Sequence, residues 1–132
     1  MAKKVTKKDT EREVNKRAGK VSEDDVCQTV KDEANFKKLF ASVEKLQTYW
    51  EDVQWVFKML KDYATGKYWE VPWRTITVLV AALAYVLAPL DLVPDFLPVI
   101  GWGDDCLALA GALAFAKMDL DEYKAWKLAQ KA

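Results

Sequence analysis

Residues 73–105 have the sequence WRTITVLVAALAYVLAPLDLVPDFLPVIGWGDD, and this stretch decides the fold. No charged residue follows Arg74 until after Leu90, so the helix predicted over residues 73–88 is apolar on all its faces. A helix of this kind lies either at the centre of a protein core or inside a membrane. We expect Pro89 to end it, because proline has no backbone N–H to continue the helical ladder.

The sequence after this helix predicts a turn and a second, shorter helix. Prolines and glycines punctuate residues 89–103 and exclude a long regular element there. The small-residue-rich segment 104–118 then predicts a helix that packs against residues 73–88 as an antiparallel hairpin. Asp119 is a candidate N-cap for a last helix, with Glu122 at the capping-box position.

The environment of this hairpin has two interpretations. The uncharged run from Thr75 to Leu90 is shorter than the roughly 20 residues that a membrane-spanning helix needs. This favours a buried hairpin in a water-soluble helical domain, with a membrane-embedded or re-entrant hairpin as the alternative. Trp69, Trp73 and Trp102 would form an interfacial belt in the second case and ordinary core aromatics in the first.

Four acids lie in and beside the loop: Asp91, Asp95, Asp104 and Asp105. No Lys, Arg or His between Thr75 and Ala116 is available to neutralise them. Helix and turn capping explains such acids without a basic partner, since carboxylates accept backbone N–H groups and are favoured at a helix N-terminus. On this interpretation Asp104 caps the second helix, Asp105 lies in its first turn, and the other two acids form turns.

The competing interpretation is a metal site. Asp91, Asp95, Asp104 and Asp105 could converge as the loop folds back, and their oxygen ligands suit Mg²⁺ or Ca²⁺. Paired carboxylates could also act as an acid and a base. The sequence has no histidine, no nucleophile motif and no phosphate-cradling glycine loop, so we do not expect an enzyme and assign no catalytic residues.

The flanking segments complete the predicted domain. Residues 36–64 predict one long amphipathic helix, with apolar residues at three- and four-residue steps. Gly66 is its stop signal, and Pro72 suits the first turn of the next helix. Residues 1–35 are dense in charge and poor in aromatics, which predicts a mobile basic arm with a short helix around residues 22–34.

Composition limits the class of protein further. The 132 residues are 52% hydrophobic, which suffices for one core, and the net charge of zero gives no general footprint for nucleic acid. Cys27 and Cys106 form no close-spaced motif, so we expect both to be reduced. The N-terminal residues contain no apolar segment of the secretory type, so we expect a cytoplasmic protein.

The central stretch resembles the YkvA-like family, the bacterial domain of unknown function 1232. The resemblance is long and ungapped, covers roughly residues 65–116, and is carried by these residues: Tyr85, Pro89, Leu90, Asp91, Leu92, Val93, Pro94, Asp95, Phe96, Pro98, Gly101, Asp104 and Asp105. It implies membrane association, because members of the family are often described in that way. It implies no activity and no catalytic residue, because the family pattern assigns none.

These observations predict an all-α protein. The fold is a small bundle of three to five helices around an apolar hairpin, with the arm at residues 1–35 and the domain at residues 36–132. The predicted function is binding of a protein partner or a membrane surface, with a second copy of the chain as a further partner. The alternatives are a divalent-cation protein that uses the four aspartates and a hairpin integral to the inner membrane.

Overall fold

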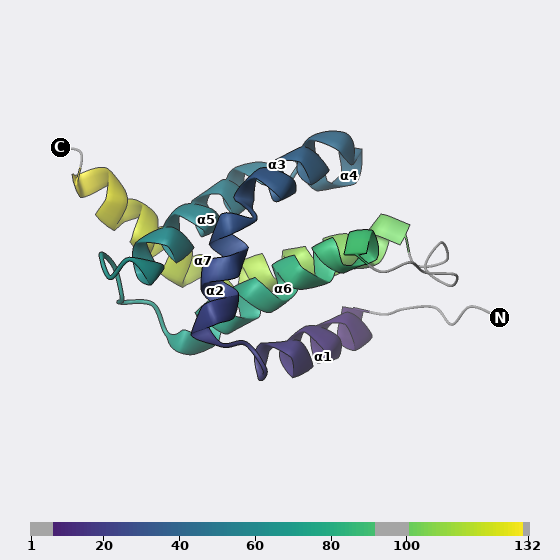
Figure 1. Ribbon diagram of the computed structural model, residues 1–132, viewed down its shortest axis with the longest axis horizontal. Helices are drawn as coiled ribbons and strands as arrows, with labels where there is room; N and C mark the ends of the chain where they lie inside the picture. The colour runs from purple at the N-terminus through teal and green to yellow at the C-terminus, as the bar shows by residue number, and fades with distance from the viewer. Residues whose placement is uncertain (1–6, 92–100, 131–132) are drawn as a thin grey trace.

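The computed structural model describes residues 7–91 and 101–130, which form seven helices and their connectors with no strand among them (Figure 1). In chain order these helices are α1 (Lys7–Ala18), α2 (Glu23–Lys31), α3 (Glu33–Ser42), α4 (Glu44–Gln47), α5 (Trp50–Ala64), α6 (Trp73–Asp91) and α7 (Gly101–Gln130). The predicted all-α fold class is confirmed. The helices outnumber the three to five predicted, partly because residues 36–64 belong to three helices.

Helices α6 and α7 run antiparallel and side by side at the centre of the molecule (Figure 1). Helix α1 packs against both, α2 packs against α5 and α6, and α4 and α5 contact α7. The buried side chains of α6 lie on all its faces: Ile76, Val78, Leu79, Val80, Ala81, Ala82, Leu83 and Val86. The chain's own helices therefore cover the apolar helix. No helix within the described ranges has both the length and the hydropathy of a membrane span.

The prediction of one helix over residues 36–64 is wrong, because the chain breaks at Val43 and again at Thr48. Val43 is extended, with φ −115° and ψ 107°, between α3 and α4. The Ser42 hydroxyl donates to the Leu39 carbonyl over 3.1 Å, and a serine that bonds back to its own helix in this way often bends it. Val43 itself is β-branched and tolerates the extended conformation well.

These breaks let the segment bury side chains that a straight helix would hold apart. Leu46, on the short helix α4, is fully buried. The rings of Phe40 and Trp50, on either side of α4, have centroids 5.3 Å apart. Packing of the aromatic side chains therefore accompanies the loss of helical hydrogen bonds.

Three predicted boundaries in the hairpin are also wrong. Helix α6 continues through Pro89 to Asp91. A proline in a helix removes one backbone hydrogen bond, and the helix tolerates this loss here because it ends two residues later. Helix α7 begins at Gly101, so Asp104 lies inside the helix rather than at its N-cap. Helix α7 then runs unbroken to Gln130.

Asp119, predicted as the N-cap of a separate helix, lies in the interior of α7. Aspartate is a modest helix former in such a position. Its carboxylate accepts a hydrogen bond from the hydroxyl of Thr75 on α6 over 2.6 Å, and Thr75 is buried. A contact between α6 and α7 therefore explains an aspartate whose local sequence suggested a helix start.

The segment before residue 36 is helical where the structure describes it. The short helix predicted around residues 22–34 is confirmed by α2, whose N-cap Ser22 forms a capping box with Asp25. Val14 and Ala18 of α1 and Val26 of α2 belong to the same core as α6. The domain boundary at residue 35 and the mobility of the arm stay predictions.

Candidate functional site

The structure does not describe the side chains of most of the predicted site residues. Pro94, Asp95 and Pro98 fall between the described ranges, and the side chains of the remaining loop residues are not described: Pro89, Asp91, Gly101, Asp104 and Asp105. The backbone alone brings Asp91, which ends α6, to the same end of the hairpin as the start of α7. Among described residues no group of three potential ligands could hold a metal ion. The metal site therefore stays a prediction.

Tyr85 is the predicted motif residue whose side chain the structure describes. It lies on α6, is half-buried and packs against the core. The guanidinium of Arg17, on α1, lies over its ring, with 5.1 Å from Cζ to the ring centroid. A cation over an aromatic face is attracted by the ring quadrupole. Tyr85 thus joins α6 to the charged N-terminal helix.

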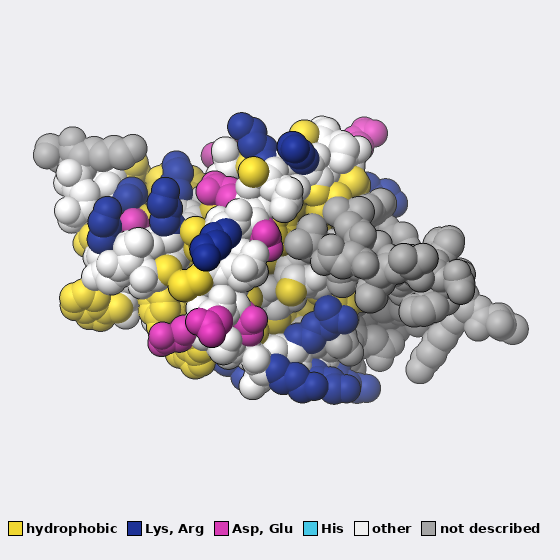
Figure 2. Space-filling view, in the orientation of Figure 1, with side chains coloured by type: hydrophobic (Ala, Val, Ile, Leu, Met, Phe, Trp, Pro, Cys, Tyr) yellow, Lys and Arg dark blue, Asp and Glu magenta, His cyan; other side chains and the backbone are white. Residues whose placement is uncertain are grey.

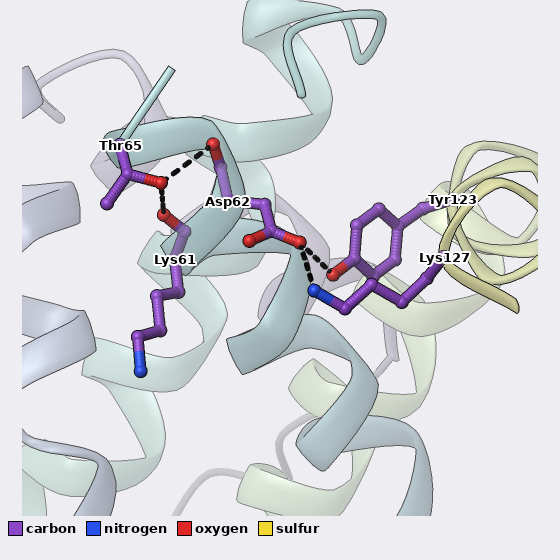
Figure 3. Close-up of polar contacts among 5 residues, drawn as sticks. All are labelled: Lys61, Asp62, Thr65, Tyr123 and Lys127. Carbon is purple, nitrogen blue, oxygen red and sulfur yellow. Dashed lines mark hydrogen bonds and ion pairs between the residues drawn. The ribbon is translucent and has the colours of Figure 1, made fainter. Parts of the chain in front are cut away.

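A buried polar cluster, formed by Asp62, Tyr123 and Lys127, connects the end of α5 to the C-terminal half of α7 (Figure 3). Asp62 is 5% exposed. One carboxylate oxygen, Oδ2, accepts the Tyr123 hydroxyl over 2.6 Å and the Lys127 ammonium over 2.9 Å. A buried carboxylate is tolerated when it is paired and hydrogen-bonded in this way.

The local fold at the end of α5 orients Asp62. Gly66 has φ +79°, the left-handed conformation that glycine adopts without strain, and confirms the predicted stop signal. The Lys67 N–H donates to the Asp62 carbonyl over 2.8 Å and the Gly66 N–H donates to the Tyr63 carbonyl over 3.2 Å. This pair of bonds is a Schellman motif. The backbone of Asp62 therefore closes the helix while its side chain holds α7.

The charge state of the cluster follows from its surroundings. Burial alone would raise the pKa of Asp62, but hydrogen bonds from Tyr123 and Lys127, with the charges of Lys127 and Lys67, outweigh it and hold the pKa below 3.8. Burial and the hydrogen bond to Asp62 raise the pKa of the Tyr123 hydroxyl well above its usual value. At neutral pH the cluster is a carboxylate held by a neutral phenol and an ammonium.

Aromatic rings enclose one side of this cluster. The ring of Tyr68 is 5.1 Å from the ring of Tyr123 and 4.8 Å from that of Trp126. Tyr68 comes from the connector between α5 and α6, and it is 4% exposed. The cluster and these rings therefore fix the connector against α7.

The connector also carries the most exposed tryptophan among the side chains that the structure describes. Trp69 is 72% exposed, and Trp73, which begins α6, is 40% exposed. The Trp73 ring stacks on the ring of Tyr63, with centroids 6.2 Å apart. Figure 2 shows hydrophobic side chains gathered at this edge of the molecule, over the α5–α6 connector. We call Tyr63, Trp69 and Trp73 the connector aromatics.

Sequence reasoning missed the Asp62 cluster. Its partners Tyr123 and Lys127 are 61 and 65 positions away, so no local spacing connects them. One signal was present, because Asp62 lies one helical turn after Met59 and continues the apolar stripe that Trp55 and Met59 begin. An acid on an apolar stripe requires a partner from another element.

Comparisons with known proteins concern mainly the hairpin. The family model described as "Protein of unknown function (DUF1232)" matches residues 75–114, which include most of α6 and the first half of α7. A relative from Bacillus subtilis (strain 168), named "Uncharacterized membrane protein YkvA", is 35% identical over 72 residues. These residues cover 54% of this chain and 68% of the relative. No solved structure matches the chain.

Proposed function

This chain belongs to the YkvA-like DUF1232 family, and we propose that it is a helical module that binds a membrane surface through the connector aromatics. The observation that carries the proposal is the exposure of Trp69 and Trp73 in one short segment. Tryptophan is enriched where protein meets the membrane interface, because its ring is apolar and its N–H is polar. The relative from Bacillus subtilis is named a membrane protein, which supports membrane association.

The burial of α6 favours peripheral binding over insertion of the hairpin. Its apolar side chains already contact α1, α2 and α7, so insertion would require these contacts to be lost. The connector needs no such rearrangement. We propose a peripheral position on the cytoplasmic surface of the inner membrane, and the integral hairpin is the alternative outcome of the test.

Charges of both signs lie beside the connector aromatics, so attraction to an anionic lipid surface would depend on basic residues elsewhere in the chain. Lys67 and Glu70 are exposed beside Trp69, and the exposed Glu23 lines the same pocket as Trp69 and Tyr63. Each basic residue near an anionic bilayer adds about 1 kcal/mol of attraction. The basic N-terminal arm predicted from the sequence would supply such residues.

Sedimentation with lipid vesicles tests the proposal. We expect the full chain to bind vesicles that contain phosphatidylglycerol more strongly than vesicles of phosphatidylcholine alone. The double variant Trp69→Ala and Trp73→Ala should weaken binding about tenfold or more, since each buried aromatic contributes a large apolar area. Met118→Ala is the matched control, because Met118 is 79% exposed and lies on α7, outside the connector aromatics.

Two results would contradict this function. If the wild-type chain stays in the supernatant with both vesicle types, the protein partner or the second copy of the chain predicted from the sequence becomes the better proposal. If wild type and double variant bind equally and resist a carbonate wash, the hairpin itself enters the bilayer. A site for Mg²⁺ or Ca²⁺ at the four aspartates remains a separate proposal, whose titration is given in the Discussion.

A further inference from the structure

A cavity of about 250 Å³ lies where α1, α6 and α7 meet. Val14, Val78, Ala112 and Phe115 form apolar walls, and Asn15 and Arg74 bring polar groups to the same space. Val78 and Ala112 are buried, whereas Phe115 is 53% exposed, so the cavity extends from the core to the surface. An apolar pocket with a few convergent polar groups is the usual form of a small-molecule site.

Arg74 gives this cavity its chemical character. Its Nη2 donates to Oδ1 of Asn15 over 3.2 Å, which holds the guanidinium beside α1. No carboxylate among the side chains that the structure describes forms an ion pair with it. A guanidinium has five N–H donors in a planar fork. After its bond to Asn15, Arg74 therefore still has N–H groups whose geometry matches a carboxylate.

We propose that this cavity binds a free single-chain amphiphile with a carboxylate head, the head on Arg74 and the apolar tail between α6 and α7. The small side chains of Ala108 and Ala112 leave room for the tail. The volume exceeds the roughly 150 Å³ of an apolar cavity that holds benzene and is below the usual range for drug-sized ligands, about 300–1,000 Å³. It suits one short chain and not a two-chain membrane lipid.

This site is distinct from the connector aromatics. Trp73 stacks toward α5, on Tyr63, whereas Arg74 reaches Asn15 on α1. The two neighbouring residues therefore serve different sides of α6. The inference does not depend on the proposed membrane function, and either can fail without the other.

Isothermal titration calorimetry with the full chain and sodium octanoate tests the inference. We expect one saturable site for octanoate, binding of octanol about tenfold weaker because it has no charge for Arg74, and no binding of acetate because it has no tail. Amide chemical shifts in the NMR spectrum should change at Val78, Ala108 and Ala112.

Variants separate the head contact from the tail contact. Arg74→Gln should weaken octanoate binding about tenfold and leave octanol unaffected. Ala112→Leu should abolish binding of both by filling the cavity, and circular dichroism checks that it folds. If it does not fold, Val78→Thr tests the tail contact with a smaller change. Lys20→Gln removes one exposed cation outside this cavity and is the charge-matched control.

Three results would overturn the inference: no saturable heat with octanoate, equal octanoate binding by wild type and Arg74→Gln, or chemical shift changes centred on Trp69 and Trp73. The last result would place the amphiphile at the connector aromatics instead of the cavity. Equal losses with Arg74→Gln and Lys20→Gln would also overturn it, because they would show a general charge effect.

Discussion

The Tyr123 hydroxyl donates to the Asp62 carboxylate over 2.6 Å, across 61 positions of sequence. This bond joins the last turn of α5 to α7 at a point where Lys127 also reaches the same oxygen. Because Asp62 is 5% exposed, water cannot readily replace either partner. The bond therefore contributes to stability and fixes the start of the connector.

Tyr123→Phe should lower the free energy of unfolding by about 1–3 kcal/mol, because it leaves a buried carboxylate with one partner fewer. Urea denaturation followed by circular dichroism measures the change. Asp121→Asn is the control, since it breaks an exposed ion pair with Lys117. The side chain of Lys117 is 73% exposed and that of Asp121 is 55% exposed. The control should change stability by less than about 1 kcal/mol. Equal effects of the two variants would contradict the role assigned to the cluster.

Stability should fall at both ends of the pH scale. The pKa of Asp62 is lower in the folded chain than its usual 3.8, so its contribution is present above about pH 4 and is lost as the pH falls through the folded value. The pKa of Tyr123 is higher in the folded chain than its usual 10, so its contribution is present below about pH 10 and is lost at more alkaline pH. Urea midpoints between pH 2 and 11, in steps of about one unit, measure both slopes. Asp62→Asn should flatten the acid slope, and an unchanged acid slope would show that other carboxylates cause it.

Thr75→Val should destabilise the hairpin by about 1–3 kcal/mol, because it keeps the side-chain shape but removes the hydroxyl that donates to Asp119. Thermal unfolding measures the loss. Thr65→Val removes a hydroxyl that donates only within its own helix end, to the carbonyls of Lys61 and Asp62, and should have the smaller effect. A larger loss of thermal stability with Thr65→Val than with Thr75→Val would mean that α7 tolerates Asp119 without the hydrogen bond from Thr75.

Gly66→Ala should cost about 1 kcal/mol, since its φ of +79° strains a residue that has a Cβ, although no atom lies within 4 Å of the added Cβ. Gly19→Ala is the matched control, because an added Cβ there makes an ordinary contact at 3.6 Å and Gly19 does not have positive φ. That substitution should be neutral or stabilising by up to about 1 kcal/mol. Urea denaturation of both variants distinguishes backbone strain from crowding.

The cation proposal predicts a saturable change on titration with Mg²⁺ or Ca²⁺. Amide shifts should centre on residues 91–105, and the melting temperature should rise with ion concentration, because an ion that binds only the folded chain stabilises it. Asp91→Asn with Asp95→Asn should abolish the shifts while the chain stays folded. If no amide moves at about 1–10 mM ion, a range in which even weak extracellular calcium sites bind, the aspartates act as caps and turns.

The sequence predicted the hairpin because its signal is local and strong. An uncharged apolar run, followed by prolines and then small residues, allows few arrangements in a chain of this size. Gly66 was predicted correctly for the same reason, since a left-handed helix stop depends on one residue type. The capping box at Ser22 and Asp25 shows that a polar pair three residues apart can also be recognised from the sequence.

Three of the failures share a cause, which is tertiary contact. The break at Val43 occurs without glycine or proline and serves the burial of Leu46. Asp119 has the local sequence of a cap but bonds to Thr75, 44 positions away. The Asp62 cluster was missed because its partners come from the far end of the chain. Local sequence patterns report contacts within one or two helical turns. The contacts of Asp119 and Asp62 join residues 44, 61 and 65 positions apart.

The burial of α6 has a consequence for biosynthesis. Ribosomes make protein at roughly 5–20 residues per second, so α6 is complete on the order of seconds before the residues of α7 that cover it, Leu109 to Leu120. During that interval the nascent chain presents an apolar helix without its final neighbour. What the helix meets first, whether α1 and α2, a chaperone or the lipid beneath the ribosome, is decided by timing as well as by composition.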